Sequence, residues 1–217
     1  MIRISLFFLM ALLAFQPDLH AASLNSRYFP STSSQTLNLG PGCRFSAAIP
    51  HTSIISARYD SAEPFGSGGF GIEKLLPPQN YWGVDFHCSR SDQDFVNSGW
   101  VISDNGTWKL NENDTNRLLL SLKALRFFRI ELVQFNGWVV TYDDTFGDEK
   151  FRQRTLSYCV VRREKAICGE SKVGYLDSIK KNGRADLTSY VLKILESIYF
   201  LEDVAPTDSN GLETQVR

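Results

Sequence analysis

Residues 126–145 read RFFRIELVQFNGWVVTYDDT, two apolar runs joined by Asn136-Gly137. An Asn-Gly pair favours a two-residue type I′ turn, because both residues tolerate a positive φ. The stretch therefore predicts a β-hairpin that turns at this pair and sets Phe135 opposite Trp138 and Val133 opposite Val140. We expect the rest of the fold to be arranged around it.

The two faces of this hairpin are both apolar, since side chains alternate across a strand. One face is expected to carry Phe127, Val133, Phe135, Trp138, Val140 and Tyr142. The other is expected to carry Phe128, Ile130, Leu132 and Val139. We expect the hairpin to lie inside a sheet that is covered on both sides, with its aromatic residues in the core.

The whole chain has the length and composition of one globular domain. It has 217 residues, of which 43% are hydrophobic and 22% charged. The formal net charge is −1, and the Lys and Arg residues are scattered. A nucleic-acid-binding domain needs a basic stripe, so we expect no nucleic-acid partner.

The start of the chain has the pattern of a secretory signal peptide. Arg3 precedes the apolar run Ile4–Phe15, and small residues follow at Ala21 and Ala22. We therefore expect residues 1–22 to be removed and the mature protein to be exported, to the periplasm in preference to full secretion. No cysteine lies just after the apolar run, so we expect no membrane anchor.

The four cysteines are expected to form two disulfides, because an even number in an exported chain favours disulfides over metal ligation. Four cysteines allow three pairings. Cys159 and Cys168 lie symmetrically about Arg163-Glu164, so a hairpin turning there would set them face to face. This leaves Cys43 to pair with Cys88.

Several further elements follow from local patterns. We expect strands over 43–49, 52–59 and 81–88, and a second Asn-Gly hairpin at Asn105-Gly106. The glycine-rich FGSGGFG, residues 65–71, is expected to be a loop, since it lacks the features of a phosphate-binding loop. Two amphipathic helices are expected: one begins at Thr115 with Asp114 as N-cap and an apolar face, and the other spans Asp186–Phe200. The leucines of the first face are Leu118, Leu119, Leu122 and Leu125.

Together these elements predict an α+β fold: a central antiparallel sheet of hairpins flanked by amphipathic helices, an α/β sandwich in a single domain. We assign residues 23–40 to a polar leader, 41–201 to the domain and 202–217 to a disordered tail.

Two stretches resemble PsbP-like proteins. Residues 192–200, LKILESIYF, resemble the terminal helix of that family, and the F-S-x-x-I-P pattern of residues 45–50 resembles its opening strand. The resemblance implies an α/β sandwich with a central antiparallel sheet, and a non-enzymatic binding or accessory role. It carries over no functional residues.

The chain shows no cofactor fingerprint and no nucleophile motif, so we expect a binding protein with neither cofactor nor metal. We expect it to block or escort a partner protein, as an immunity or inhibitor protein does with a secreted toxin enzyme. The acidic stretch DDTFGDE is the expected docking surface, because an acidic edge suits a basic active-site cleft. Its carboxylates are Asp143, Asp144, Asp148 and Glu149.

Two alternative functions remain open. An envelope hydrolase needs only two carboxylates at a suitable separation, and Asp85 lies two residues before His87, on the same face of an expected strand. A PsbP-like assembly or accessory factor would instead bind a housekeeping partner.

Overall fold

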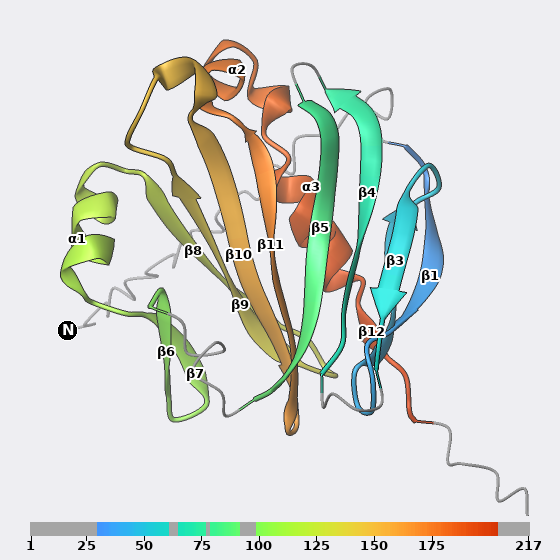
Figure 1. The fold of residues 1–217 in the computed structure, drawn as a ribbon. Helices are drawn as coiled ribbons and strands as arrows, with labels where there is room; N and C mark the ends of the chain where they lie inside the picture. The colour runs from blue at the N-terminus through green and yellow to red at the C-terminus, as the bar shows by residue number, and fades with distance from the viewer. Residues whose placement is uncertain (1–29, 61–64, 77–78, 92–98, 204–217) are drawn as a thin grey trace, which may run out of the picture.

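The computed structural model describes residues 30–60, 65–76, 79–91 and 99–203 (Figure 1). The expected signal peptide and most of the expected disordered tail lie outside the described residues. In chain order the elements are β1 (Thr32–Asn38), β2 (Arg44–Pro50), β3 (Ile54–Arg58), β4 (Ser67–Leu76), β5 (Gln79–Arg90), β6 (Val101–Asp104), β7 (Thr107–Leu110), α1 (Asp114–Ser121), β8 (Leu125–Glu131), β9 (Asn136–Asp143), η1 (Glu149–Phe151), β10 (Gln153–Arg162), β11 (Lys165–Tyr175), α2 (Leu176–Lys181), η2 (Gly183–Ala185), α3 (Thr188–Glu196) and β12 (Tyr199–Phe200).

The fold is α+β and rich in antiparallel sheet. The main sheet has seven strands in the order β3-β4-β5-β11-β10-β9-β8. A second sheet has the order β1-β2-β12, and β6 and β7 form a separate hairpin. Figure 1 shows α3 behind the main sheet and the α1 and β6–β7 region at its other side. The central strand of the main sheet is thus β11, and the β8–β9 hairpin, which was expected inside the sheet, lies at its edge.

The inner face of the main sheet forms the larger hydrophobic core. Alternate side chains of β5, including the fully buried Phe86, pack with residues of β2 and α3. The ring of Phe86 lies 5.2 Å from that of Phe45 on β2, centroid to centroid. The Cys43–Cys88 disulfide joins the start of β2 to β5 and so links the two sheets covalently.

The outer face of the main sheet has a smaller core at one end. This smaller core contains the buried residues Trp138, Val140, Cys159 and Cys168. The covering residues come from the β6–β7 hairpin, whose Trp108 is buried against them. Cys159 and Cys168 are directly opposite in the β10–β11 ladder and form a disulfide, the pairing expected from the symmetric hairpin.

The register expected for the β8–β9 hairpin is wrong. Glu131 pairs with Asn136 and Ile130 with Gly137, so the connection is residues 132–135 and not Asn136-Gly137. The slip is by an even number of positions, so Trp138 and Val140 keep their expected face. Phe135 leaves that face: its ring packs against Phe200 in the inner core.

The physical reason lies in Gly137, which permits close approach between strands and does not serve a turn. A Cβ at Gly137 would lie 2.2 Å from the carbonyl oxygen of Cys159 on β10. The other pair, Asn105-Gly106, does form the two-residue turn: both residues have positive φ, 51° and 76°, and Asp104 pairs with Thr107.

Two segments expected to be irregular are strands. β1 occupies much of residues 23–40, the expected polar leader, and pairs with β2 along its whole length. The glycine-rich segment 65–71 runs into β4, between β3 and β5. Its glycines admit close neighbours: a Cβ at Gly69 would lie 2.6 Å from the carbonyl oxygen of Val84.

Both expected helices are shorter than predicted. α1 begins at Asp114 with Asn113 as N-cap, and Leu118 and Leu122 are more than half exposed. A buried amide anchors this helix in place of the leucines, because Asn116 Nδ2 donates to the carbonyls of Gly99, Trp100 and Asn111.

The closing helix, α3, ends at Glu196, and Tyr199–Phe200 forms β12 beside β2. Leu187 occupies the N-cap position, although Asp186 Oδ1 accepts a hydrogen bond from the Thr188 N–H. The apolar positions expected on this helix, from Leu187 to Ile198, are buried.

Among the described residues, no helix has the length and apolarity needed to cross a membrane.

The two Asn-Gly pairs provide a matched test of this assignment. Gly137→Ala should lower the free energy of unfolding by about 3 kcal/mol, because the new methyl group meets backbone atoms of β10. Gly106→Ala should lower the free energy of unfolding by about 1 kcal/mol, because alanine is strained at this positive φ. A Cβ at Gly106 meets no other atom within 4 Å, so no clash adds to this cost. Urea denaturation of both variants measures the difference; an equal or larger loss for Gly106→Ala would contradict the role assigned to Gly137.

Candidate functional site

The uncovered end of the outer face forms an open groove with a volume of about 550 Å³. Its lining residues come from strands β5, β9, β10 and β11, and Tyr175 is the last residue of β11. Its lining is mainly polar and aromatic: Tyr81, Trp82, Gly83, Asp85, Tyr142, Gln153, Thr155, Glu170, Ser171, Lys172 and Tyr175. Four strands of one rigid sheet thus position its functional groups.

The groove lies where strands β5 and β11 stop pairing with each other. The β5–β11 ladder runs from Lys165 opposite Arg90 to Cys168 opposite His87. Beyond it, two side-chain hydroxyls bond to carbonyls of β5: Tyr158 donates to Asp85 (2.7 Å) and Ser171 to Gly83 (2.7 Å). These bonds satisfy backbone acceptors that would otherwise lack a ladder partner.

Gly169 makes this arrangement possible. A Cβ at Gly169 would lie 1.8 Å from the carbonyl oxygen of Asp85 and 2.9 Å from the hydroxyl of Tyr158. Tyr158 is fully buried, and that burial raises the pKa of its hydroxyl well above the usual value. The hydroxyl is therefore a neutral hydrogen-bond donor that holds β5 in place.

Of the two candidate residues on β5, the groove is lined by Asp85 and not by His87. Both side chains are exposed on the outer face, as the strand alternation predicted. The structure instead brings Asp85 into the same groove as Glu170, a carboxylate that sequence reasoning did not identify. Neither carboxylate forms an ion pair with another described residue.

Tyr142 marks the boundary between the covered and the open ends of the outer face. Its ring stacks on Trp100 at a centroid distance of 4.6 Å. Burial raises the pKa of the Tyr142 hydroxyl, and the nearby Glu170 carboxylate raises it further. Tyr142 and Glu170 both line the groove.

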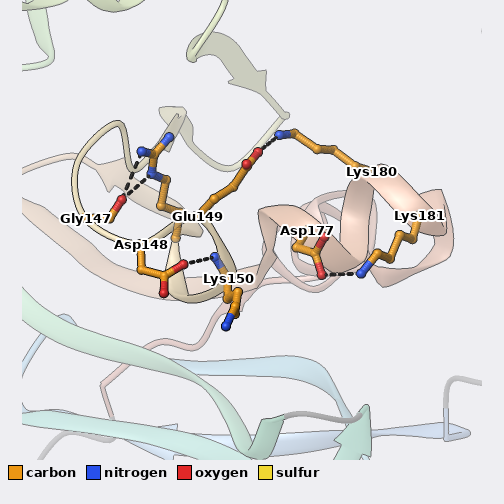
Figure 2. Close-up of polar contacts among 8 residues, drawn as sticks. Gly147, Asp148, Glu149, Lys150, Asp177, Lys180 and Lys181 are labelled. Carbon is orange, nitrogen blue, oxygen red and sulfur yellow. Dashed lines mark hydrogen bonds and ion pairs between the residues drawn. The ribbon is translucent and has the colours of Figure 1, made fainter.

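The acidic stretch expected to dock a partner connects β9 to β10 beside this groove. All four of its carboxylates bond to atoms of their own chain, and Figure 2 shows the bonds of Asp148 and Glu149. Asp148 accepts a hydrogen bond from the Lys150 N–H at 3.1 Å, and Glu149 pairs with Lys180, whose hydrogen bond lowers the pKa of that carboxyl. Asp144 accepts a hydrogen bond from the Phe146 N–H.

Asp143 differs from the other three carboxylates because it is mostly buried in an ion-pair network. Arg154 donates to both oxygens of Asp143, at 2.6 and 2.8 Å, and to Asp186 at 2.6 Å. The hydrogen bonds to Asp143 raise the pKa of Arg154 above its ordinary value. Asp143 therefore fixes the end of β9 to β10 and to the segment that precedes α3.

The same loop exposes two aromatic rings that sequence reasoning did not include in the site. Phe146 is 81% exposed and Phe151 is 70% exposed. The loop that carries them is held by an internal contact, since Arg152 donates two hydrogen bonds to the carbonyl of Gly147 (Figure 2).

Across the described residues, no three His, Cys, Asp or Glu side chains are grouped to hold a metal ion.

The fold and the groove define a disulfide-bonded α+β protein with an open polar groove, and the two disulfides fit folding outside the cytoplasm. The solved structures include a similar one, the solution structure of cyanobacterial PsbP (CyanoP) from Synechocystis sp. PCC 6803. It is 13% identical with a TM-score of 0.45, over 80% of this chain and 94% of that chain. The relation is a weak, PsbP-like likeness in fold.

No protein-family model matches this chain, and no curated protein sequence is significantly similar to it.

The ion-pair network predicts that Asp143 stabilises the fold. Asp143→Asn should lower the free energy of unfolding by about 2 kcal/mol, because it weakens the pairing of the mostly buried Arg154 guanidinium. Asp144→Asn, one residue along and exposed, should change it by less than about 0.5 kcal/mol. Chemical denaturation at neutral pH compares the two; equal stabilities would show that the network contributes nothing.

Proposed function

We propose that this protein is an exported binding protein that blocks or escorts a partner protein. The observation that carries the proposal is the exposure of Phe146 and Phe151 on a loop that also presents Asp144 and Asp148. Aromatic side chains are enriched among the residues that dominate protein–protein binding energy. Two such rings in water, beside carboxylates, favour a docking surface.

The internal bonds of the loop support the same proposal. Asp144, Asp148 and Arg152 each bond to backbone groups of the loop, and Glu149 ties it to α2 through Lys180. A loop held in one conformation loses little conformational freedom on binding. We define the docking loop as residues 144–151.

Within this class we favour an immunity or inhibitor protein that neutralises a secreted toxin enzyme in the periplasm. The exposed carboxylates of the docking loop suit a basic active-site cleft, which they would approach faster through electrostatic steering. A PsbP-like accessory factor would use the same kind of surface on a housekeeping partner. The identity of the captured partner distinguishes the two.

A second candidate function, an envelope hydrolase, is favoured by one observation: Asp85 and Glu170 line the same groove. Glycoside hydrolysis uses two carboxylates flanking the scissile bond. Assays of peptidoglycan, lipid and protein substrates with the wild type and with Asp85→Asn and Glu170→Gln test it. Undetectable hydrolysis by the wild type, or unchanged hydrolysis by both variants, would exclude these carboxylates as a catalytic pair.

The docking loop predicts the outcome of partner capture. The mature protein, residues 23–217, should retain a stoichiometric protein partner from the native envelope and secretome. Phe146→Ala combined with Phe151→Ala should weaken that complex by at least about 100-fold, because each hot-spot aromatic contributes about 2 kcal/mol or more. Affinity purification with mass spectrometry identifies the partner, and calorimetry measures its affinity.

Tyr199→Ala is the matched control, since Tyr199 is 54% exposed on β12 and lies outside the docking loop. Its affinity should equal that of the wild type. Undiminished capture by the Phe146/Phe151 double variant would refute the docking loop, and a loss shared equally by Tyr199→Ala would do the same.

A further inference from the structure

The polar groove lies beside both ends of the docking loop. Tyr142 precedes the loop and Gln153 follows it, and both line the groove. A partner segment that contacts Phe146 or Phe151 can therefore continue onto the outer face of the main sheet. The groove is open on this face, so an extended segment can lie in it.

The charges in the groove favour a cation. Asp85 and Glu170 lie on its lining with one ammonium group, that of Lys172. Among the described residues, none of these three side chains takes part in an ion pair. The groove lining therefore offers an added cation two carboxylates against one ammonium group.

Aromatic rings supply the second feature that a cation needs. Tyr81, Tyr142 and Tyr175 line the groove from three different strands. The hydroxyl end of Tyr81 lies against Gly71 of β4, where a Cβ would come within 1.8 Å of its oxygen, so this ring borders the groove on its β4 side. Cations are attracted to the faces of aromatic rings, and a flat ring on a rigid strand provides such a face.

We propose that the groove binds an Arg or Lys side chain of an extended segment of the partner, with its cationic group between Asp85 and Glu170. The inference rests on the proposed function, because it specifies the chemistry of the partner segment that lies next to the docking loop. The backbone of that segment would find donors and acceptors in the polar side chains of Gln153, Thr155 and Lys172.

The test is a titration of the mature protein with blocked peptides, followed by two-dimensional amide NMR. Acetyl-Ala-Arg-Ala-Arg-Ala-amide should shift resonances of β5 and β11 around the groove, and the same peptide with Gln in place of Arg should bind at least about 10-fold more weakly. Asp85→Asn and Glu170→Gln should each weaken binding of the Arg peptide by about 5-fold or more. High salt should weaken it as well.

Glu131→Gln is the matched control, because Glu131 is exposed at the end of β8 and does not line the groove. Its affinity for the Arg peptide should equal that of the wild type. Equal binding of the Arg and Gln peptides, or shifts confined to other surfaces, would overturn the inference. Binding of a neutral oligosaccharide of N-acetylglucosamine in preference to the Arg peptide would also overturn it and assign the groove to sugars.

The two proposals fail separately. If the peptide does not bind but the Phe146/Phe151 double variant loses its partner, the docking loop stands and the groove inference is wrong. If the peptide binds at the groove and the double variant captures its partner undiminished, the groove stands and the docking loop is wrong.

Discussion

The structure depends on the burial of two apolar faces of one seven-stranded sheet. On the inner face, side chains of the main sheet pack against α3 and the β1-β2-β12 sheet, and the Cys43–Cys88 disulfide fastens the two layers. The outer face is covered only where the β6–β7 hairpin places Trp108 over Trp138. The unequal covering leaves polar and aromatic side chains of four strands open at the other end. The candidate site is therefore a direct consequence of how this sheet is buried.

The open end is held rigid by interactions that reach into the core. Arg154 joins Asp143 to Asp186, and so couples the start of the docking loop to the segment before α3. On the other side, the hydroxyl of Tyr158 passes through the space that Gly169 leaves and holds the backbone of Asp85. Both devices hold candidate binding groups in place through core contacts. Binding sites gain affinity from such preorganisation.

Local chemistry in the sequence predicted the elements whose partners are near in the chain. The cysteine hairpin and the turn at Asn105-Gly106 have the expected registers, and the apolar positions of α3 are buried. The errors arise where a glycine makes room for the backbone of the next strand: Gly137 admits atoms of β10 and Gly69 admits atoms of β5, which no local pattern shows. The residues of the candidate site divide in the same way. The sequence singled out Asp85 because His87 lies two residues away, whereas the order of the strands in the sheet brings Glu170 into the same groove. The exposure of Phe146 and Phe151 depends on the whole fold.

Site-specific photo-cross-linking shows whether the docking loop, beside the open groove, binds a protein. A photoreactive phenylalanine analogue replaces Phe146 in one sample and Tyr199 in another, and both are exposed to the native envelope fraction. We expect one dominant cross-linked protein from position 146 and none from position 199, with the cross-linked partner residues next to an Arg or Lys. Equal cross-linking from both positions, or from position 199 alone, would contradict this expectation.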